Sequence, residues 1–157
     1  MSLKPTSLSP LQLKSHAFPV VSIRANPNGK PTGASALDQQ VSCLPVQGVA
    51  NHWNLQLQIS LHSTDQNNPF CYEIEIVAVG VVELIGEVPQ ERREVIAAVN
   101  GLGILYSACR EMLINISARS IWGAFTIPSL NFSQVLEEAN KNLKERQNIP
   151  EAKAVTT

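Results

Sequence analysis

The residue types that most often carry out catalysis are scattered along this chain rather than gathered into motifs. Its three histidines are His16, His52 and His62, and none forms a His-x-x-x-His pair. The sequence contains no nucleophile elbow and no paired-carboxylate motif. Each histidine is therefore predicted to be a surface residue, and the chain is predicted not to be an enzyme, with no catalytic residues.

Metal and cofactor chemistry also find little support in the sequence. Cys43, Cys71 and Cys109 are odd in number and have neither CxxC nor metal-like spacing, so we expect reduced, buried thiols in a cytoplasmic protein. The Gly101-Leu102-Gly103 segment is a weak phosphate-loop signal, because no strand precedes it directly and no Lys or Ser/Thr follows in place. We predict no metal and no cofactor.

A different chemistry, the burial of apolar polypeptide, is suggested by the segment IWGAFTIPSL at residues 121–130. It places five large apolar residues in a loop, where they are costly to expose to water. One interpretation is that they plug the core. The other is that they form an apolar wall of a groove that accepts unfolded chain, through non-directional burial and hydrogen bonds to an exposed strand edge.

Four predicted strands precede this loop. The first spans residues 11–25, a short second one 41–46, a third 53–62 and a fourth 70–85, separated by turn-rich segments. The third alternates apolar and polar residues without a break, which is typical of a strand with one buried face. The fourth alternates at first, with Glu73 and Glu75 on one face, and is then apolar on both faces, so we expect both sides of the sheet to be covered there. Strands followed by helices predict an α+β domain with a four-stranded antiparallel sheet.

A long helix is predicted from Pro89 to about Arg119. One wide apolar stripe would cover the sheet, and a second patch of small and apolar residues, including Ile104, Ile114 and Ala118, suggests contact with another subunit. Gly101 and Gly103 weaken a helix and indicate either a kink or a close backbone approach. Arg110 and Glu111 are adjacent and point in different directions, so an interface ion pair or a cap on the loop is the expected role.

A second, shorter helix is predicted to start at a cap formed by Asn131 or Ser133 and to end near Lys144. The chain therefore reads as a flexible arm over residues 1–10, one domain over 11–144, and a polar, disordered tail over 145–157.

Composition narrows the classes of partner. Net charge is −1, which gives no attraction for nucleic acid. The longest apolar run, Ile76 to Val82, is too short to span a bilayer, and the N-terminus shows no signal-peptide pattern. Only 16% of the residues are charged, against about 25% in typical domains. Either part of the surface is covered in an oligomer or binds apolar partners, or the surface is neutral and rich in Ser, Asn and Gln.

Residues 100–132 read NGLGILYSACREMLINISARSIWGAFTIPSLNF. This stretch resembles the SecB-type protein-export chaperones of bacteria. In that family a helix of the form N-x-x-x-ILFPYARE leads through RG-x-FP-x-L-x-L-x-PVNF into a second helix. Nine residues of this chain fall in register without gaps: Asn100, Ile104, Leu105, Tyr106, Arg110, Glu111, Arg119, Asn131 and Phe132. The family's Pro-Tyr is Ser107-Ala108 here, and its Phe-Pro is Trp122-Gly123, which marks a divergent member.

The resemblance implies an ATP-independent, cytoplasmic chaperone of unfolded polypeptides that assembles as a homotetramer, a dimer of dimers, through the long helix. The matching interface positions are Ala108, Ile114 and Ala118, and the second apolar patch of the helix adds Ile104 to the predicted interface. The family's client groove is formed by the crossover loop, the second helix and the sheet, and the matching loop residues are Trp122, Phe125, Ile127, Leu130 and Phe132.

The family also docks on the translocase motor ATPase SecA through acidic residues of its sheet. One such position matches Glu75, next to Glu73, whereas two others fall on Val20 and Arg24. The alternative interpretation of Glu73 and Glu75 is a solvated strand face. The alternatives for the whole chain are a dedicated chaperone of one partner, such as an antitoxin, and an oligomeric scaffold or ligand-binding domain without chaperone activity.

Overall fold

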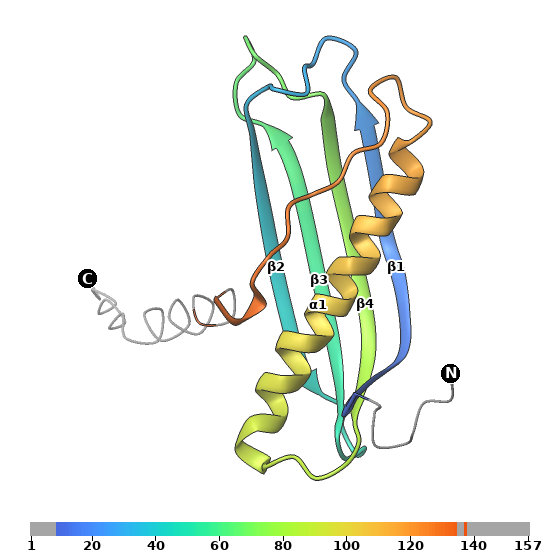
Figure 1. Cartoon of the computed structure of the whole chain (residues 1–157), viewed down its shortest axis with the longest axis vertical. Helices are drawn as coiled ribbons and strands as arrows, with labels where there is room; N and C mark the ends of the chain where they lie inside the picture. The colour runs from blue at the N-terminus through green and yellow to red at the C-terminus, as the bar shows by residue number, and fades with distance from the viewer. Residues whose placement is uncertain (1–8, 135–136, 138–157) are drawn as a thin grey trace, which may run out of the picture.

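Figure 1 shows four antiparallel strands with one long helix lying across them, in a computed structural model that describes residues 9–134 and 137. The elements are β1 (Leu11–Ala25), β2 (Ser35–Pro45), β3 (His52–Ser63), β4 (Tyr72–Leu84) and α1 (Gln90–Ser117). The strand order is β1-β4-β3-β2, so β3 and β4 are central and β1 and β2 are the edges. The α+β class and the antiparallel four-stranded sheet are as the sequence predicts.

The inner face of the sheet is apolar because β3 and β4 alternate in phase. Their register pairs Leu57 with Ala78 and Ile59 with Ile76, so the buried residues of both strands share one face. All four of these side chains have no exposed surface. The helix α1 lies across this face, and its own buried residues, such as Leu105, Cys109 and Leu113, point back at the sheet.

Most element boundaries agree with those expected from the sequence. β1 has the predicted limits, α1 begins directly after Pro89, and β3 and β4 lie within two residues of prediction. The expected limits of β2 are wrong, because the strand begins at Ser35 and not at Val41. The segment Ser35–Gln40 has few strand-favouring residues, but β2 pairs with β3 at eleven successive positions. Tertiary pairing therefore decides its conformation.

The second helix is described only at its start. Residues 132–134 are helical, and Asn131 Oδ1 accepts a hydrogen bond from the Ser133 amide at 3.1 Å, which makes Asn131 the cap. The predicted end of this helix near Lys144, the predicted tail 145–157 and the first eight residues of the predicted arm lie outside the described residues.

The outer face of the sheet is more open than expected. Val77, Val79 and Val81 on β4 point away from α1 and are half-buried, so in the described chain nothing covers this face as α1 covers the other. A shallow hollow of about 390 Å³ lies there, lined in part by Val79, Val81 and Leu44. The double-sided apolar pattern of β4 therefore does not reflect two covered faces within one chain.

Two glycines of α1 have opposite surroundings. A Cβ at Gly101 would lie 2.3 Å from Leu55 Cδ1 and 3.3 Å from Val82 Cγ1, so only glycine lets the helix approach the sheet this closely. A Cβ at Gly103 would meet nothing within 4 Å. The close approach suggested by the sequence is therefore confirmed at Gly101 and does not apply to Gly103.

This contrast gives a matched test of helix packing. Gly101→Ala should lower the free energy of unfolding by about 1–3 kcal/mol, because the added methyl group overpacks the core. Gly103→Ala should raise it by about 0.5–1 kcal/mol, because alanine favours the helix and meets no neighbour. Urea unfolding of the two variants measures both changes, and equal effects would contradict the packing described.

Candidate functional site

The apolar loop predicted at residues 121–130 leaves the end of α1 through a tight turn. The amide of Ser120 donates to the Ser117 carbonyl at 2.8 Å, and the amide of Gly123 donates to the Ser120 carbonyl at 3.0 Å. Gly123 has a φ of 75°, a left-handed conformation that glycine adopts without strain. The chain then returns across β4 and β3 toward β2 without helix or strand (Figure 1). We call residues 118–131 the crossover loop.

A buried serine fixes the start of this return. Ser117 Oγ donates to the Leu113 carbonyl at 2.6 Å and accepts a hydrogen bond from the Phe125 amide at 2.7 Å. Its exposed fraction is 1%; the bond to Leu113 is buried, and the bond from Phe125 is partly buried. The hydroxyl therefore joins the last turn of α1 to the crossover loop.

Two tyrosine hydroxyls hold the backbone of the crossover loop, and a tryptophan of the loop bonds to a neighbouring segment. The Tyr72 hydroxyl donates to the Gly123 carbonyl at 2.6 Å, and the Tyr106 hydroxyl donates to the Pro128 carbonyl. Trp122 Nε1 donates to the Asn26 carbonyl at 2.9 Å, which attaches the loop to the segment after β1. Burial raises the pKa of Tyr106 to about 12, so its hydroxyl keeps its proton and its donor role at neutral pH.

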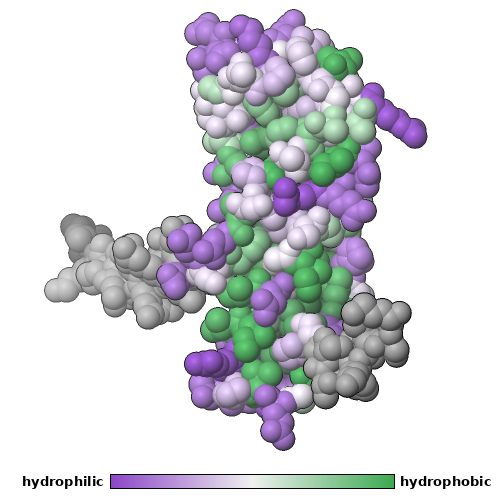
Figure 2. All heavy atoms as spheres, in the orientation of Figure 1, coloured by the Kyte–Doolittle hydropathy of each residue, from purple (hydrophilic) through white to green (hydrophobic). Residues whose placement is uncertain are grey.

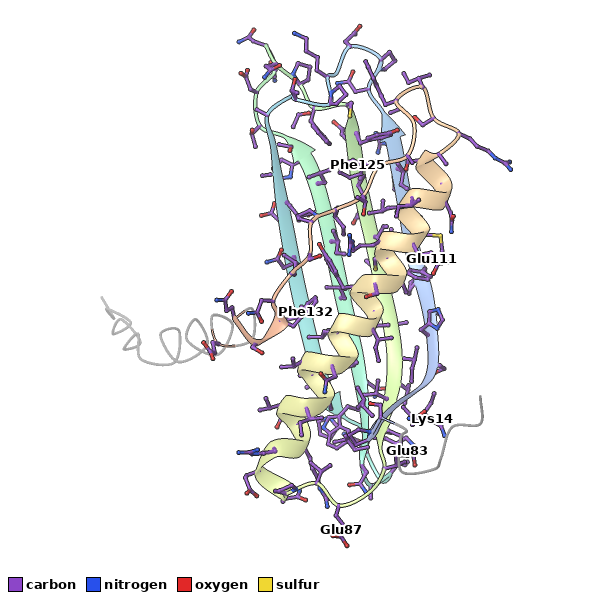
Figure 3. The ribbon with its side chains drawn as sticks, viewed as in Figure 1. Lys14, Glu83, Glu87, Glu111, Phe125 and Phe132 are labelled. Carbon is purple, nitrogen blue, oxygen red and sulfur yellow. The ribbon has the colours of Figure 1, made fainter. Side chains whose placement is uncertain are left out.

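The five predicted client-binding residues all pack toward the sheet in the single chain. Ile127 has no exposed surface and Phe132 is 5% exposed, whereas Trp122, Phe125 and Leu130 are half-buried. Their distribution along the crossover loop is visible in Figure 3, where Phe125 lies near its upper end and Phe132 at its lower end.

Aromatic contacts anchor both ends of this series. The ring of Phe125 lies 5.6 Å from that of Phe70 and 5.4 Å from that of Tyr72, measured between centroids. The rings of Tyr106 and Phe132 meet edge to face at 5.5 Å. Such pairs favour these geometries and add to the apolar burial. Within one chain the loop therefore fills part of the core, and a role in client binding stays a prediction.

Arg110 reaches toward the crossover loop. Its guanidinium lies 3.4 Å from Thr126 Oγ1 and 3.5 Å from Ser129 Oγ, which are long, weak hydrogen bonds. Of the two roles expected for Arg110 and Glu111, this arrangement favours a contact with the loop for Arg110. Glu111 is exposed on another side of α1 (Figure 3).

The predicted oligomer-interface residues lie outside the buried face of α1, with Ala118 directly after its last residue, Ser117. Ile104 is 38% exposed and Ile114 is 41% exposed, Ala118 is exposed, and Ala108 is half-buried. Exposed isoleucines on a helix that already buries one face are unusual for a surface that meets only water. Figure 2 shows apolar surface gathered over the lower half of this view, where α1 crosses the sheet.

Glu73 and Glu75 are exposed on the outer face of the sheet, as predicted. Arg24 of β1 is the register partner of Glu73, and His62 Nδ1 lies 3.6 Å from Asp38 Oδ2 on the same side of the sheet. A shallow hollow of about 310 Å³ is lined in part by Arg24, His62, Glu73 and Glu75. The face carries both signs of charge, so its field is weaker than that of a purely acidic surface.

The cysteines show no sign of nucleophilic reactivity. All three are free, and burial raises the pKa of Cys43 and of Cys109 to about 11. A thiol with a raised pKa is protonated at neutral pH and is a poor nucleophile. In the part of the chain that the structure describes, no group of three or more His, Cys, Asp or Glu side chains could hold a metal ion, and no helix is long and apolar enough to cross a membrane.

Two residues of the site were not singled out from the sequence. Tyr72 stands at the start of a strand, where an aromatic residue is typical of a core position, and Ser117 is one of several serines near the end of α1. Only the path of the returning loop shows that both hold its backbone.

The fold corresponds to that of a known chaperone structure. Neither protein-family models nor curated protein sequences match this chain. Among solved structures, it is similar to the SecB-like chaperone Rv1957 of Mycobacterium tuberculosis, solved in complex with a ChAD peptide from the Rv1956 HigA1 antitoxin. The TM-score is 0.54 at 15% identity, over 76% of this chain and 90% of that one. This chain therefore has a SecB-like fold.

A second similar structure is a protein of unknown function from Streptococcus agalactiae. It has 11% identity and a TM-score of 0.47, over 76% of this chain and 97% of that one.

The contribution of Ser117 to stability can be measured by comparison with Ser107, which makes a similar hydrogen bond but is exposed to solvent. Ser117→Ala should lower the free energy of unfolding by about 1–3 kcal/mol, because the partly buried Phe125 amide loses its acceptor. Ser107 Oγ donates to the Gly103 carbonyl at 2.9 Å but is exposed, so Ser107→Ala should change stability by less than about 0.5 kcal/mol. Urea unfolding distinguishes the two, and a silent Ser117→Ala would show that the hydrogen bond to Phe125 is not needed.

Proposed function

We propose that this protein is an ATP-independent molecular chaperone that binds non-native polypeptides through apolar surface on the crossover-loop side of its sheet. The observation that carries the proposal is the crossover loop itself. It places large apolar side chains over the sheet without fixing its own backbone in a helix or strand. Surfaces that accept many sequences use such non-directional burial.

The client-contact residues of the proposal are Trp122, Phe125, Ile127, Leu130 and Phe132. The first two and Leu130 present part of their surface to solvent in the single chain, whereas Ile127 and Phe132 do not. The SecB-like fold supports the same function, and the raised thiol pKa values offer no support for a cysteine-based enzyme.

A dedicated chaperone of one partner is the second candidate. The observation that favours it is that Rv1957, whose fold this chain shares, was solved with a peptide from an antitoxin. A pulldown from lysate with the purified chain separates the two forms, because a general chaperone captures many unfolded proteins and a dedicated one captures a single partner. An oligomeric scaffold without chaperone activity would capture neither.

An export role would require docking on a motor such as SecA through Glu73 and Glu75. Arg24 stands beside Glu73 in the sheet and opposes the acidic field there. We therefore favour a general chaperone that binds unfolded polypeptides in the cytoplasm over a role in protein export.

The direct test of the proposed function uses an unfolded client and no nucleotide. We expect the purified protein to slow the aggregation of a chemically unfolded client and to bind it with micromolar or tighter affinity, because apolar segments of the client become buried. Light scattering and calorimetry measure these effects, and the same client in its folded form is the control. Absence of binding to the unfolded form would favour the scaffold.

The proposed assembly is a homotetramer, a dimer of dimers, whose interface includes Ile104, Ala108, Ile114 and Ala118 on α1. Ile114→Glu should dissociate it, because a carboxylate buried in an apolar interface without a partner is strongly unfavourable. Val95 is 59% exposed on the first turns of α1 and lies outside the four positions, so Val95→Glu is the matched control and should leave the assembly intact. Sedimentation velocity at micromolar concentration measures both, and a monomeric wild type would contradict the proposal.

A further inference from the structure

The crossover loop is held by groups that recognise polypeptide in general. Among the described residues, no backbone-to-backbone hydrogen bond involves residues 124–130. The backbone from Gly123 to Pro128 is held instead by three hydroxyl groups, those of Tyr72, Ser117 and Tyr106. These hydroxyls bond to carbonyl and amide groups, which every polypeptide segment carries.

The side chains of this segment are held in an equally general way. Phe125 packs against the rings of both Phe70 and Tyr72, and Ile127, two positions later, is fully buried. Between and after them, Thr126, Pro128 and Ser129 are exposed. An extended segment with large apolar residues at alternate positions therefore suffices to occupy this surface. Among the described residues, the hydrogen bonds that hold it on the sheet side come from hydroxyl groups and not from charged groups.

The outer side of the segment is only loosely held. The contacts of Arg110 with Thr126 and Ser129 are 3.4 and 3.5 Å long, near the limit for a hydrogen bond. If residues 123–128 left the sheet, the three bonds to hydroxyl groups would break and two large apolar side chains would become exposed. No strand pairing and no helix hydrogen bond would be lost, because residues 124–130 make none. The loop can therefore separate from the sheet without unfolding the sheet or α1.

We propose that residues 123–128 occupy the protein's own peptide-binding site, and that a client binds by taking their place. The site comprises the rings of Phe70 and Tyr72 and the hydroxyls of Tyr72, Ser117 and Tyr106. Its ligand class is extended polypeptide with bulky apolar residues two positions apart, as Phe125 and Ile127 are. This inference rests on the proposed chaperone function and changes one part of it: Phe125 and Ile127 cover the site until a client takes their place, and Trp122, Leu130 and Phe132 remain the proposed client contacts.

Competition of this kind sets a threshold for binding. A client segment must bury at least as much apolar surface as the loop re-exposes, so polar or folded segments are rejected while the site itself stays covered. The apparent affinity for a client equals the intrinsic affinity multiplied by the fraction of molecules whose loop has left. A loop that binds its own site more weakly therefore gives tighter client binding, whereas a loop that only lines a groove gives weaker binding when it is trimmed.

The direction in which one substitution changes the client affinity distinguishes these two cases. Ile127→Val removes one buried carbon from the loop and none from the site, and we expect it to tighten binding of fluorescein-labelled, carboxymethylated, permanently unfolded α-lactalbumin by about threefold to tenfold. Val82→Ala is the control, because Val82 is equally buried but lies beneath Gly101, away from the loop. It destabilises the core at least as much and should leave the client affinity unchanged. Thermal melts confirm that both variants fold.

Hydrogen exchange provides a second measurement that needs no variant. In the free protein the Phe125 amide is bonded to buried Ser117 Oγ and should exchange slowly. Saturation with the client should make the amides of residues 123–127 exchange faster, because this segment has left the site.

The outcomes separate the two proposals. Tighter binding by Ile127→Val together with faster loop exchange supports the displacement mechanism. If wild type binds the client but Ile127→Val binds it equally or more weakly, or if the client slows exchange in the loop, displacement is wrong and the chaperone function stands. If neither wild type nor Ile127→Val binds the client, both proposals are overturned.

Discussion

One helix is too narrow to cover a four-stranded sheet, and much of this structure follows from that mismatch. Four strands spaced about 4.8 Å apart span roughly 14 Å between the outermost backbones, and their side chains extend further, whereas a helix with its side chains is about 10–12 Å wide. α1 crosses the sheet diagonally, from β2 at its start toward β1 at its end (Figure 1). The apolar inner face beside it must be covered by another part of the chain.

The crossover loop provides that cover, and its chemistry reflects the task. A loop that lies on an apolar surface must satisfy its backbone groups there, because buried amides and carbonyls without partners are strongly unfavourable. Tyr72, Tyr106 and Ser117 supply these partners. The crossover loop is therefore attached to the sheet by side-chain hydrogen bonds and not by strand pairing. Because no strand pairing depends on it, its replacement by another polypeptide is physically reasonable.

The sequence predicts secondary structure correctly where local residue patterns determine it. The alternation from Trp53 to His62, Pro89 before the helix and Asn131 at the next cap each reflect a preference that acts over a few residues. The beginning of β2 was missed because long-range pairing with β3 decides it. The path of the crossover loop was equally beyond local pattern, since the bond between Ser117 and the Phe125 amide depends on where the chain turns back. The sequence could therefore identify the apolar residues of the site without showing which of them are covered.

The central claim is that non-native polypeptide binds on the crossover-loop side of the sheet. Site-specific photo-crosslinking tests it directly, with p-benzoylphenylalanine placed either at Leu130 in the crossover loop or at Val79 on the outer face of the sheet. Both side chains are half-buried and apolar, so the two probes are comparable. An unfolded client should form adducts with the probe at Leu130 and not with the probe at Val79. Adducts at Val79 without adducts at Leu130 would place client binding on the opposite face and contradict the account.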